Sequence, residues 1–318
     1  MRLGEVRVAE DQDFRQLVAL ADNHDGWKLD FCNNSTKVWT KQPDEKECKM
    51  MKASTTYTDV DAATVYDVIH DVDYTKHYDK SMLAIDTGGC LNPNNQIFYY
   101  AMACPSPLCN RDLVVLRSWL DTGREYYSLG HSVSHQQFPP RKGFVRALNY
   151  LSGYVVRPLS PKSCQVNYVT YGSPGGQLPV WLANKATQVL VPKMVKRFHK
   201  ACLKYAGWKK RHNAHFKPWL FPEQMPIERL NLALADTHVH ECSTCKHTFK
   251  SARLRDEHYT RTGHEKRSPC PVCQRFFHPD FLRIHLNSHS GAFRCKVCDT
   301  HFSSQATLAR PPCTATAA

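Results

Sequence analysis

Cysteine and histidine pairs near the end of the chain carry the most specific chemistry in the sequence. Each of two sets joins a Cys-x2-Cys pair to two later histidines; the ligands are Cys242, Cys245, His258 and His264 in the first set and Cys270, Cys273, His285 and His289 in the second. Two thiolates and two imidazoles form the tetrahedral donor set that zinc prefers. Because the protein fills all four positions, the sequence predicts two structural zinc ions and no catalytic metal.

The spacing of these ligands resembles that of C2H2 zinc fingers, small ββα units folded around one ion. Apolar residues for the small cores are present, namely Phe249 and Leu254 in residues 241–264 and Phe276 and Leu282 in residues 270–289. A third unit begins in residues 290–318 with Cys295, but Pro311 stands where its first histidine is expected. We expect this truncated finger and tail to hold no zinc; a distorted site completed by His301 and Cys313 is the alternative.

The fingers show no pattern for reading DNA sequence. In DNA-reading fingers, helix positions −1, 3 and 6 face the bases. Here those positions hold Ser251, Leu254 and Glu257 in the first finger and His278, Phe281 and Ile284 in the second. Leucine, phenylalanine and isoleucine side chains form no hydrogen bonds with base edges. Basic residues nearby could contact the phosphates of double-stranded RNA, and docking of a protein is equally open.

Charge and cysteine usage divide the 318-residue chain into two modules. The formal net charge of +13 indicates a polyanionic partner, either a membrane surface or nucleic acid. Half of the fourteen cysteines are scattered before residue 205, as in a reduced cytosolic protein, and the other half crowd into the finger region. No long apolar run and no signal-peptide core is present. We expect a soluble intracellular protein with a first domain at residues 1–224 and a linker at residues 225–240.

Short apolar runs separated by Gly, Pro and Asn are typical of antiparallel strands, and they fill most of the first module. Helices are expected at residues 11–22 and, capped by Asp59 or Asp61, up to residue 70, with a short turn or helix at residues 71–79. Strands are expected at residues 27–31, 38–40, 49–57, 95–103, 113–120, 125–134, 144–151, 153–156 and 165–171. With a long helix at the end, this order predicts an α+β fold whose sheet curves around that helix.

Residues 173–205 hold this closing helix. Pro179 suits its first turn and Pro192 favours a kink. Its apolar stripe consists of Leu182, Ala186, Val189, Leu190, Met194, Phe198, Ala201 and Tyr205, and its cationic face includes Lys193, Lys196, Arg197 and Lys200. Such a helix could close an apolar interior and touch anionic lipid head groups. A helix packed on the sheet with a solvated basic face is the alternative.

Tyrosines are frequent in the expected strands: Tyr99, Tyr100, Tyr126, Tyr127, Tyr150, Tyr154, Tyr168 and Tyr171. Several must face the interior, where each hydroxyl needs a partner. A cavity that holds a lipid head group would provide such partners, and the rings would attract a quaternary ammonium. Ordinary amphipathic strand positions are the alternative.

Several motifs of the first module occur in the order found in START domains. They are DVDYTKHYD at residues 71–79, Pro105 to Pro107 leading into Asn110-Arg111-Asp112, Pro174 to Trp181, Ala201 to Tyr205, and His215 to Trp219. Residues 10–224 therefore resemble a START domain, and most of all its phosphatidylcholine-transfer branch. The resemblance implies a helix-grip fold that encloses one lipid, with the last helix as gate. It also implies transport of phospholipid between membranes and no enzymatic activity.

The resemblance implies a choline cage that this sequence keeps only in part. Two cage positions hold aromatic residues, Tyr100 and Tyr150. Other cage positions hold Leu113, Val115 and Thr170, which have no aromatic face. A reduced cage implies a looser preference that covers choline and ethanolamine head groups.

The phosphate clamp implied by the same resemblance is also altered. Thr75 stands where the choline-specific relative has an arginine, while the acidic neighbour of that arginine is kept as Asp79. Lys76 could supply charge at this place, but a lysine lacks the bidentate fork of a guanidinium.

These patterns together predict a cytoplasmic phospholipid-binding and transfer protein that contacts membranes transiently and carries two zinc modules. A lipid-gated regulator that binds nucleic acid in the nucleus through its fingers is the alternative. Salt-sensitive binding of nucleic acid by residues 236–318 would distinguish the second from the first.

Overall fold

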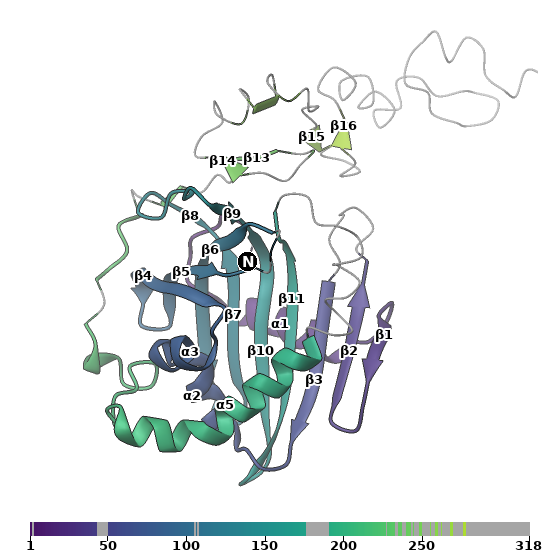
Figure 1. Ribbon diagram of the computed structural model, residues 1–318, viewed down its shortest axis with the longest axis vertical. Coiled ribbons are helices and arrows are strands. Elements are labelled where there is room, and N and C mark those ends of the chain that lie inside the picture. Colours follow the sequence, from purple (N-terminus) through teal and green to yellow (C-terminus); the bar gives the residue numbers. More distant parts are fainter. Residues whose placement is uncertain are drawn as a thin grey trace, which may run out of the picture. The chain divides into compact units, whose positions relative to one another are not determined.

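The protein divides into two compact units, Met1–Val239 and His240–Ala318 (Figure 1). The computed structural model describes residues 1, 3–42, 50–104, 106, 108–175, 191–226 and 228–232, and after them only 235–236, 240–242, 244, 248–249, 255, 258–259, 262, 268–269 and 276–277. The first unit is therefore described almost throughout. The expected start of the closing helix, residues 179–190, lies outside the described residues.

One ten-stranded sheet forms the first unit. Its strands follow the order β1-β2-β3-β11-β10-β7-β6-β5-β4, and β9 pairs with β6 in parallel, while the other pairs are antiparallel. The bounds are β1 Lys28–Cys32, β2 Thr36–Lys41, β3 Met50–Tyr57, β4 Met82–Asn92, β5 Asn95–Met102, β6 Asn110–Asp121, β7 Tyr126–Ser132, β9 Phe144–Arg146, β10 Leu148–Ser160 and β11 Ser163–Ser173. A separate pair joins β8, Ser134–His135, to β12, Ala235–Asp236. Because β3 pairs with β11, the last strand of the sheet joins its N-terminal strands to the rest.

The described helices of this unit are α1 (Asp11–Asp22), α2 (Ala62–His70), α3 (Val72–Tyr78) and α5 (Val191–Arg211), with a 3-10 turn η2 at Pro222–Gln224. Asp61 caps α2 by accepting a hydrogen bond from the backbone N–H of Thr64, and Asp71 caps α3 in the same way through Tyr74. Each such cap satisfies an N–H that the helix leaves without an internal partner. Asp71 thus ends α2 and starts α3, which fixes the angle between the two helices.

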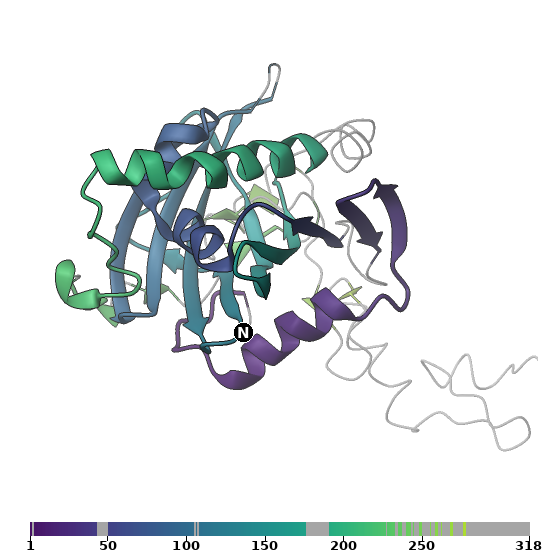
Figure 2. The same ribbon diagram turned by 90° about the horizontal axis from the view of Figure 1, so that it is seen from below.

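Helices cover the sheet on both sides, with α1 on one face and α5 on the other (Figure 2). We call the face toward α1 the outer face. Leu17 of α1 is fully buried there against Leu129 and Val155. Gly153 makes this approach possible, since a Cβ at that position would lie 2.7 Å from the Leu17 side chain. The outer face is therefore a closely packed layer.

We call the opposite face, toward α2, α3 and α5, the inner face. Ala201, Cys202 and Tyr205 of α5 are buried there in one cluster with α2 and the sheet. Phe198 packs at the edge of this cluster. Met194, expected in the apolar stripe, is 54% exposed, so that part of the predicted stripe is wrong.

Within the described residues, most of the expected strands and helices are present at the expected positions, and one strand was missed. The long strand β4 was not expected because its centre contains Gly88 and Gly89, which weaken a strand pattern. Gly89 has a φ of +101°, a conformation that favours glycine, and the register of β4 shifts between Thr87 and Cys90. The expected strands at residues 144–151 and 153–156 are divided differently, into the short β9 and the long β10.

Two small hairpins are described in the second unit. One pairs β13 (His240–Glu241) with β14 (Thr248–Phe249), and the other pairs β15 (Ser268–Pro269) with β16 (Phe276–Phe277). Each connection between the paired strands contains one of the predicted Cys-x2-Cys pairs. Of the predicted zinc ligands, Cys245, His264, Cys270, Cys273, His285 and His289 lie outside the described residues, as does the truncated third finger.

Candidate functional site

The inner face of the sheet keeps accessible surface even though α5 lies over it. Along β6, the inward side chains of Leu113 and Arg117 are half-buried, although Val115 between them is buried, while Val114 and Leu116 on the outer face are fully buried. A similar alternation occurs on β10 and β11, where Ser152, Tyr154, Tyr168 and Thr170 are half-buried and Val155 and Val169 are fully buried. Side chains that alternate in this way line a surface that the protein's own packing does not fill.

Aromatic side chains dominate this surface near α5. The ring of Tyr154 lies 4.6 Å from that of Tyr168 and 6.2 Å from that of Phe198 on α5. Tyr78 of α3 also meets Phe198, at 6.5 Å. Burial raises the pKa of Tyr154 well above its ordinary value, so the hydroxyl stays protonated and can donate a hydrogen bond. The surface is therefore apolar over the rings and polar at the hydroxyls.

Buried charges anchor the C-terminal end of α5. Lys209 forms an ion pair with Asp71 at 2.7 Å, and both side chains are almost fully buried, with 8% and 5% exposed. Tyr205 donates a further hydrogen bond to the same carboxylate. Asp71 also caps α3, so one side chain joins α5 to the helix that precedes β4.

The segment after α5 is anchored in the same region. Lys217 forms an ion pair with Asp67 of α2 at 2.5 Å, and Trp219 Nε1 donates a hydrogen bond to the other oxygen of that carboxylate at 2.9 Å. Burial raises the pKa of Asp67, and the hydrogen bonds from Lys217 and Trp219 oppose that rise. The His215-to-Trp219 motif therefore holds the chain on α2 beyond the end of α5.

More exposed contacts hold the first half of α5. Arg197 donates to Asp79, at the end of α3, at 3.0 Å, and 40% of the arginine side chain is exposed. His199 meets Asp59 at 2.7 Å and stacks on Tyr57, with ring centroids 4.5 Å apart. Exposed pairs of this kind contribute about 0–1 kcal/mol. This part of the helix is therefore held less firmly than its C-terminal end.

The predicted membrane-contact residues occupy different surroundings. Lys193, Lys196 and Lys200 are exposed, as expected, whereas Arg197 forms an ion pair with Asp79. Two large apolar side chains, Met194 and Leu203, are also exposed on this helix, at 54% and 51%. Positions 193, 196, 200 and 203 repeat at three- and four-residue intervals and so lie along one side of the helix.

Of the predicted head-group residues, the structure brings together some and separates others. Tyr100 of β5 pairs in register with Leu113 of β6 on the inner face, and Val115 faces the same way two residues further on. Thr170 lies on the inner face of β11 opposite Ser152. Tyr150 stands at a bulge of β10, and its ring meets Tyr171 at 4.8 Å; Tyr171 packs against the outer-face cluster under α1. The two predicted cage aromatics, Tyr100 and Tyr150, therefore have separate neighbours.

The predicted phosphate-clamp residues lie on α3 and just after it. Thr75 is half-buried and Lys76 is exposed. Asp79 accepts hydrogen bonds from Ser81 on one oxygen and from Arg197 on the other. An arginine does reach Asp79, then, but it comes from the closing helix rather than from position 75.

Sequence patterns alone also missed residues of the inner face. Arg117 of β6 donates to Ser128 Oγ at 3.1 Å and to the carbonyl oxygen of Ile69 at 2.9 Å. The ring of His70, at the end of α2, lies 4.2 Å from Tyr66 and 5.2 Å from Trp119. Period-two alternation with Leu113 and Val115 was the available signal that Arg117 faces inward.

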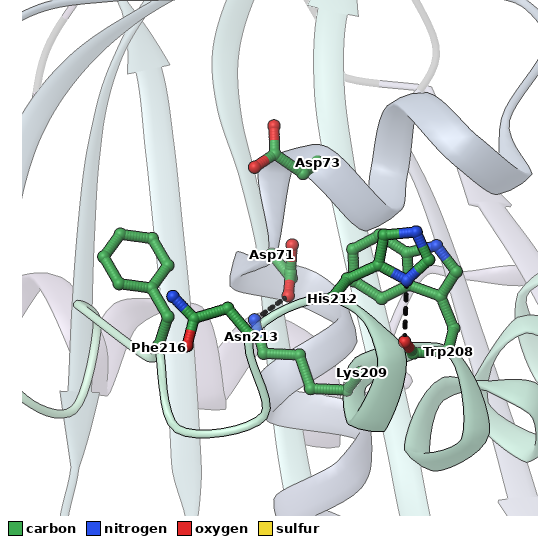
Figure 3. Close-up of a pocket in the computed structure, with 7 residues that line it drawn as sticks. All are labelled: Asp71, Asp73, Trp208, Lys209, His212, Asn213 and Phe216. Carbon is green, nitrogen blue, oxygen red and sulfur yellow. Dashed lines mark hydrogen bonds and ion pairs between the residues drawn. The ribbon is translucent and has the colours of Figure 1, made fainter.

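A surface pocket of about 420 Å³ lies at the C-terminal end of α5 (Figure 3). Its lining residues are Asp71, Asp73, Trp208, Lys209, His212, Asn213 and Phe216. The His212 ring stacks on Trp208 at 4.3 Å, and the Lys209–Asp71 pair crosses its floor. None of the predicted lipid-binding residues lines this pocket. It is distinct from the inner face.

Comparisons with known proteins agree with this architecture. Residues 5–209 match the model of the START domain family. START domain-containing protein 10 of Mus musculus is 39% identical over 248 residues, which cover 78% of this chain and 84% of that protein. Phosphatidylcholine transfer protein of Mus musculus is 33% identical over 147 residues, covering 45% of this chain and 68% of that protein.

A solved structure shows the same arrangement. The crystal structure of human STARD10 superposes with a TM-score of 0.70 at 40% sequence identity, covering 73% of this chain and 96% of the other. A curved antiparallel sheet with a closing C-terminal helix is the expected helix-grip fold, and both are present here. In sequence and in fold, this chain belongs to the START domain family.

Proposed function

We propose that the first unit binds one phospholipid between the inner face and α5 and carries it between membranes. The observation that supports this most directly is the accessible inner face, where half-buried aromatic and polar side chains lie opposite a closing helix. A diacyl phospholipid needs both kinds of surface, because its chains are apolar and its head group must keep hydrogen bonds.

The relatives support the same class of ligand. Phosphatidylcholine transfer protein is, by its name, a carrier of a choline phospholipid. That name describes a carrier rather than a catalyst, which fits the expected non-enzymatic role. Phosphatidylcholine and phosphatidylethanolamine are the proposed ligands of this chain, because only part of the aromatic cage is present.

The two ends of α5 suggest how the lipid enters. Breaking the buried Lys209–Asp71 pair would leave a charge without a partner, which costs about 3–5 kcal/mol. Releasing Arg197 from Asp79 exposes groups that water can solvate. We infer that α5 opens by moving its first half away from the sheet while its last turns stay in place.

Membrane contact would be made by the exposed side of the same helix. Lys193, Lys196 and Lys200 can approach anionic head groups, and Met194 and Leu203 can enter the interfacial layer. No helix in the described part of the chain is long and apolar enough to cross a bilayer. We therefore propose peripheral, reversible contact.

Native mass spectrometry of the full chain purified from cells tests the lipid proposal. We expect one bound phospholipid per chain and transfer of fluorescent phosphatidylcholine between vesicles. A chain that carries no lipid, and that accepts neither choline nor ethanolamine phospholipid from vesicles, would contradict the proposal.

For the second unit we propose two structural zinc ions in C2H2 fingers. Each small hairpin encloses one Cys-x2-Cys pair, and Cys242 is fully buried while His258 is 8% exposed, as expected for ligands withdrawn from water. These residues would hold one ion with Cys245 and His264, and the second set would hold the other. Thr262 donates to the carbonyl oxygen of His258, four residues before it, which fits a helix at the histidine pair.

Metal analysis tests this second proposal. We expect two zinc ions per chain and one in a Cys270→Ser variant. Chelation should abolish the folded signal of the second unit and leave the first unit folded, because metal binding and folding are coupled in such modules. Three ions per chain would show that the truncated third finger also binds metal.

A further inference from the structure

One arginine of the inner face has no acidic partner. The half-buried arginines Arg7, Arg146, Arg157 and Arg197 each pair with a carboxylate. Arg111 is buried and donates to three main-chain carbonyl oxygens. Arg117 instead makes two hydrogen bonds to neutral acceptors, and its Nη1 has no partner among the described residues. A partly desolvated guanidinium without a counter-charge is costly, so an anion at this place would be stabilising.

The surroundings of Arg117 hold its guanidinium on the inner face. Its guanidinium lies 5.7 Å from the centre of the Phe98 ring, and the Ile69 carbonyl at the end of α2 fixes one edge of it. The positive charge reaches three neighbours, because it opposes the burial-driven rise in the pKa of Tyr66 and of Tyr154 and helps to lower that of His70. The two tyrosines thus keep protonated hydroxyls beside a cation.

Hydrogen-bond donors lie near one another on this part of the inner face. Arg117 Nε donates to Ser128 Oγ, and Tyr154 pairs in register with Ser128. Arg117 Nη2 donates to the carbonyl oxygen of Ile69, and the ring of the next residue, His70, lies 4.2 Å from that of Tyr66. Arg117 offers N–H groups, and the hydroxyls of Tyr66 and Tyr154 accept or donate to no other described residue. A guanidinium with flanking hydroxyls is a donor set that binds a phosphodiester. The two charged oxygens of the phosphodiester are spaced so that two N–H groups of one guanidinium can bond them side by side. The buried carboxylates of α2 and its C-terminal cap are held by other partners, Asp67 by Lys217 and Trp219 and Asp71 by Lys209 and Tyr205.

We propose that Arg117, with Tyr66 and Tyr154, binds the phosphate group of the phospholipid carried by this domain. The proposal rests on the proposed function and deepens it. Position 75 on α3 holds a threonine in place of the arginine of the choline-specific relative. The phosphate-binding guanidinium would instead come from Arg117, on the inner face of β6. The head group would then lie between β6, the end of α2 and Phe198 of α5, since Tyr154 contacts that ring.

Three variants of the full chain test the site. Arg117→Gln removes the charge, and Arg117→Lys keeps the charge but cannot form bidentate hydrogen bonds. The control, Arg157→Gln, removes a half-buried arginine that pairs with Asp22 and Glu125 away from the inner face. Each is titrated with vesicles of dioleoyl phosphatidylcholine and with diacylglycerol of the same acyl chains, and its melting temperature is measured without lipid. Inorganic phosphate is added separately as a competitor.

We expect Arg117→Gln to bind phosphatidylcholine roughly tenfold to a hundredfold more weakly than the parent, as for the loss of a charge-assisted hydrogen bond, with Arg117→Lys between them. Diacylglycerol binding, weak or absent in the parent, should be the same in all variants, and Arg157→Gln should bind both lipids as the parent does. Inorganic phosphate should displace no lipid.

Other results would overturn the proposal. An unchanged affinity of Arg117→Gln for phosphatidylcholine would do so, and so would equal losses for phosphatidylcholine and diacylglycerol, which indicate a structural role. Should Arg117→Gln fail to fold, Arg117→Lys decides, because parent-like phosphatidylcholine affinity in that variant excludes a bidentate contact. Displacement of lipid by inorganic phosphate in the parent would identify free phosphate as the ligand. A parent that binds no phospholipid would instead contradict the proposed function itself.

Discussion

The two ends of α5 are held by interactions of the same chemical kind but of different burial. At the C-terminal end, Lys209 and Asp71 form a pair that is almost fully withdrawn from water. In the first half, Arg197 and Asp79 form a pair whose arginine is 40% exposed. Water solvates the charges of an exposed ion pair when it breaks, but it cannot reach those of a buried pair. Breaking the buried pair therefore costs more free energy than breaking the exposed one. The comparison indicates a hinge at the last turns of the helix and an opening at its first half.

The largest effect is expected where the buried anchor is broken. Lys209→Ala leaves the Asp71 carboxylate without its ammonium partner, and we expect a loss of about 3–5 kcal/mol in the free energy of unfolding of the first unit. Tryptophan fluorescence during urea unfolding measures this, because Trp208 and Trp219 lie beside Lys209. The exposed neighbour Lys210, changed to alanine, is the control and should cost less than about 0.5 kcal/mol. Equal losses in the two variants would remove the contrast between the ends of the helix.

The next effect concerns the exposed side of the first half of α5. Replacing Lys193, Lys196 and Lys200 by glutamine should weaken binding to anionic vesicles by about 3 kcal/mol, because each cation near such a surface contributes about 1 kcal/mol. Transfer from anionic vesicles should slow by up to about a hundredfold, while transfer from neutral vesicles changes little. A triple substitution at Lys37, Lys142 and Lys162, which are exposed and lie outside α5, is a matched control for total charge. Similar slowing with neutral vesicles would point to a purely structural helix.

The third effect concerns the Lys217–Asp67 pair, which anchors the segment after α5 and should make the stability of the first unit depend on pH. Because the folded protein raises the pKa of Asp67, the folded state holds more protons than the unfolded state between the two pKa values, and stability falls as the pH rises through that window. Lys217→Ala removes the main opposing cation, so the pKa should rise further. We expect a loss of about 1.5–3 kcal/mol at pH 7.5 that becomes smaller as the pH falls toward 5. Urea unfolding at several pH values measures this; a loss that is independent of pH would mean that Asp67 does not titrate in this range.

The smallest effect is expected at the exposed pair. Arg197→Gln should change stability by about 0.2–1 kcal/mol. If release of this pair precedes the opening of α5, the rate of lipid exchange should rise by up to about fivefold. The affinity for phosphatidylcholine, which the Arg117 site binds, should not fall. Stopped-flow exchange of fluorescent phosphatidylcholine gives the rate. Slower exchange in this variant would show that Arg197 acts in lipid or membrane contact rather than as a latch.

Local patterns of the sequence determined most of the secondary structure of the first unit. Asp59 and Asp61, ahead of the apolar positions of α2, were the two predicted caps of that helix, and in the structure Asp61 caps it by accepting a hydrogen bond from the backbone N–H of Thr64. The alternation of apolar and polar residues located most strands, because side chains of a strand point to opposite faces in turn. The zinc ligands follow from spacing alone and stay a prediction. Such features depend on neighbours within a few residues, and these are visible in any one stretch of the chain.

Tertiary structure alone decided which of these residues meet. Lys209 lies 138 positions from Asp71 in the chain, and Arg197 lies 118 positions from Asp79, so no local pattern connects them. The bulge between Asn149 and Leu151 sets Tyr150 beside Tyr171 and apart from Tyr100, although strand alternation by itself is blind to an inserted residue. Strand β4 forms because β5 offers it a pairing edge despite its two glycines. The physical reason is the same in each case. Pairing partners and burial depend on how the strands and helices pack together in space, and in the sequence these elements are only separate segments.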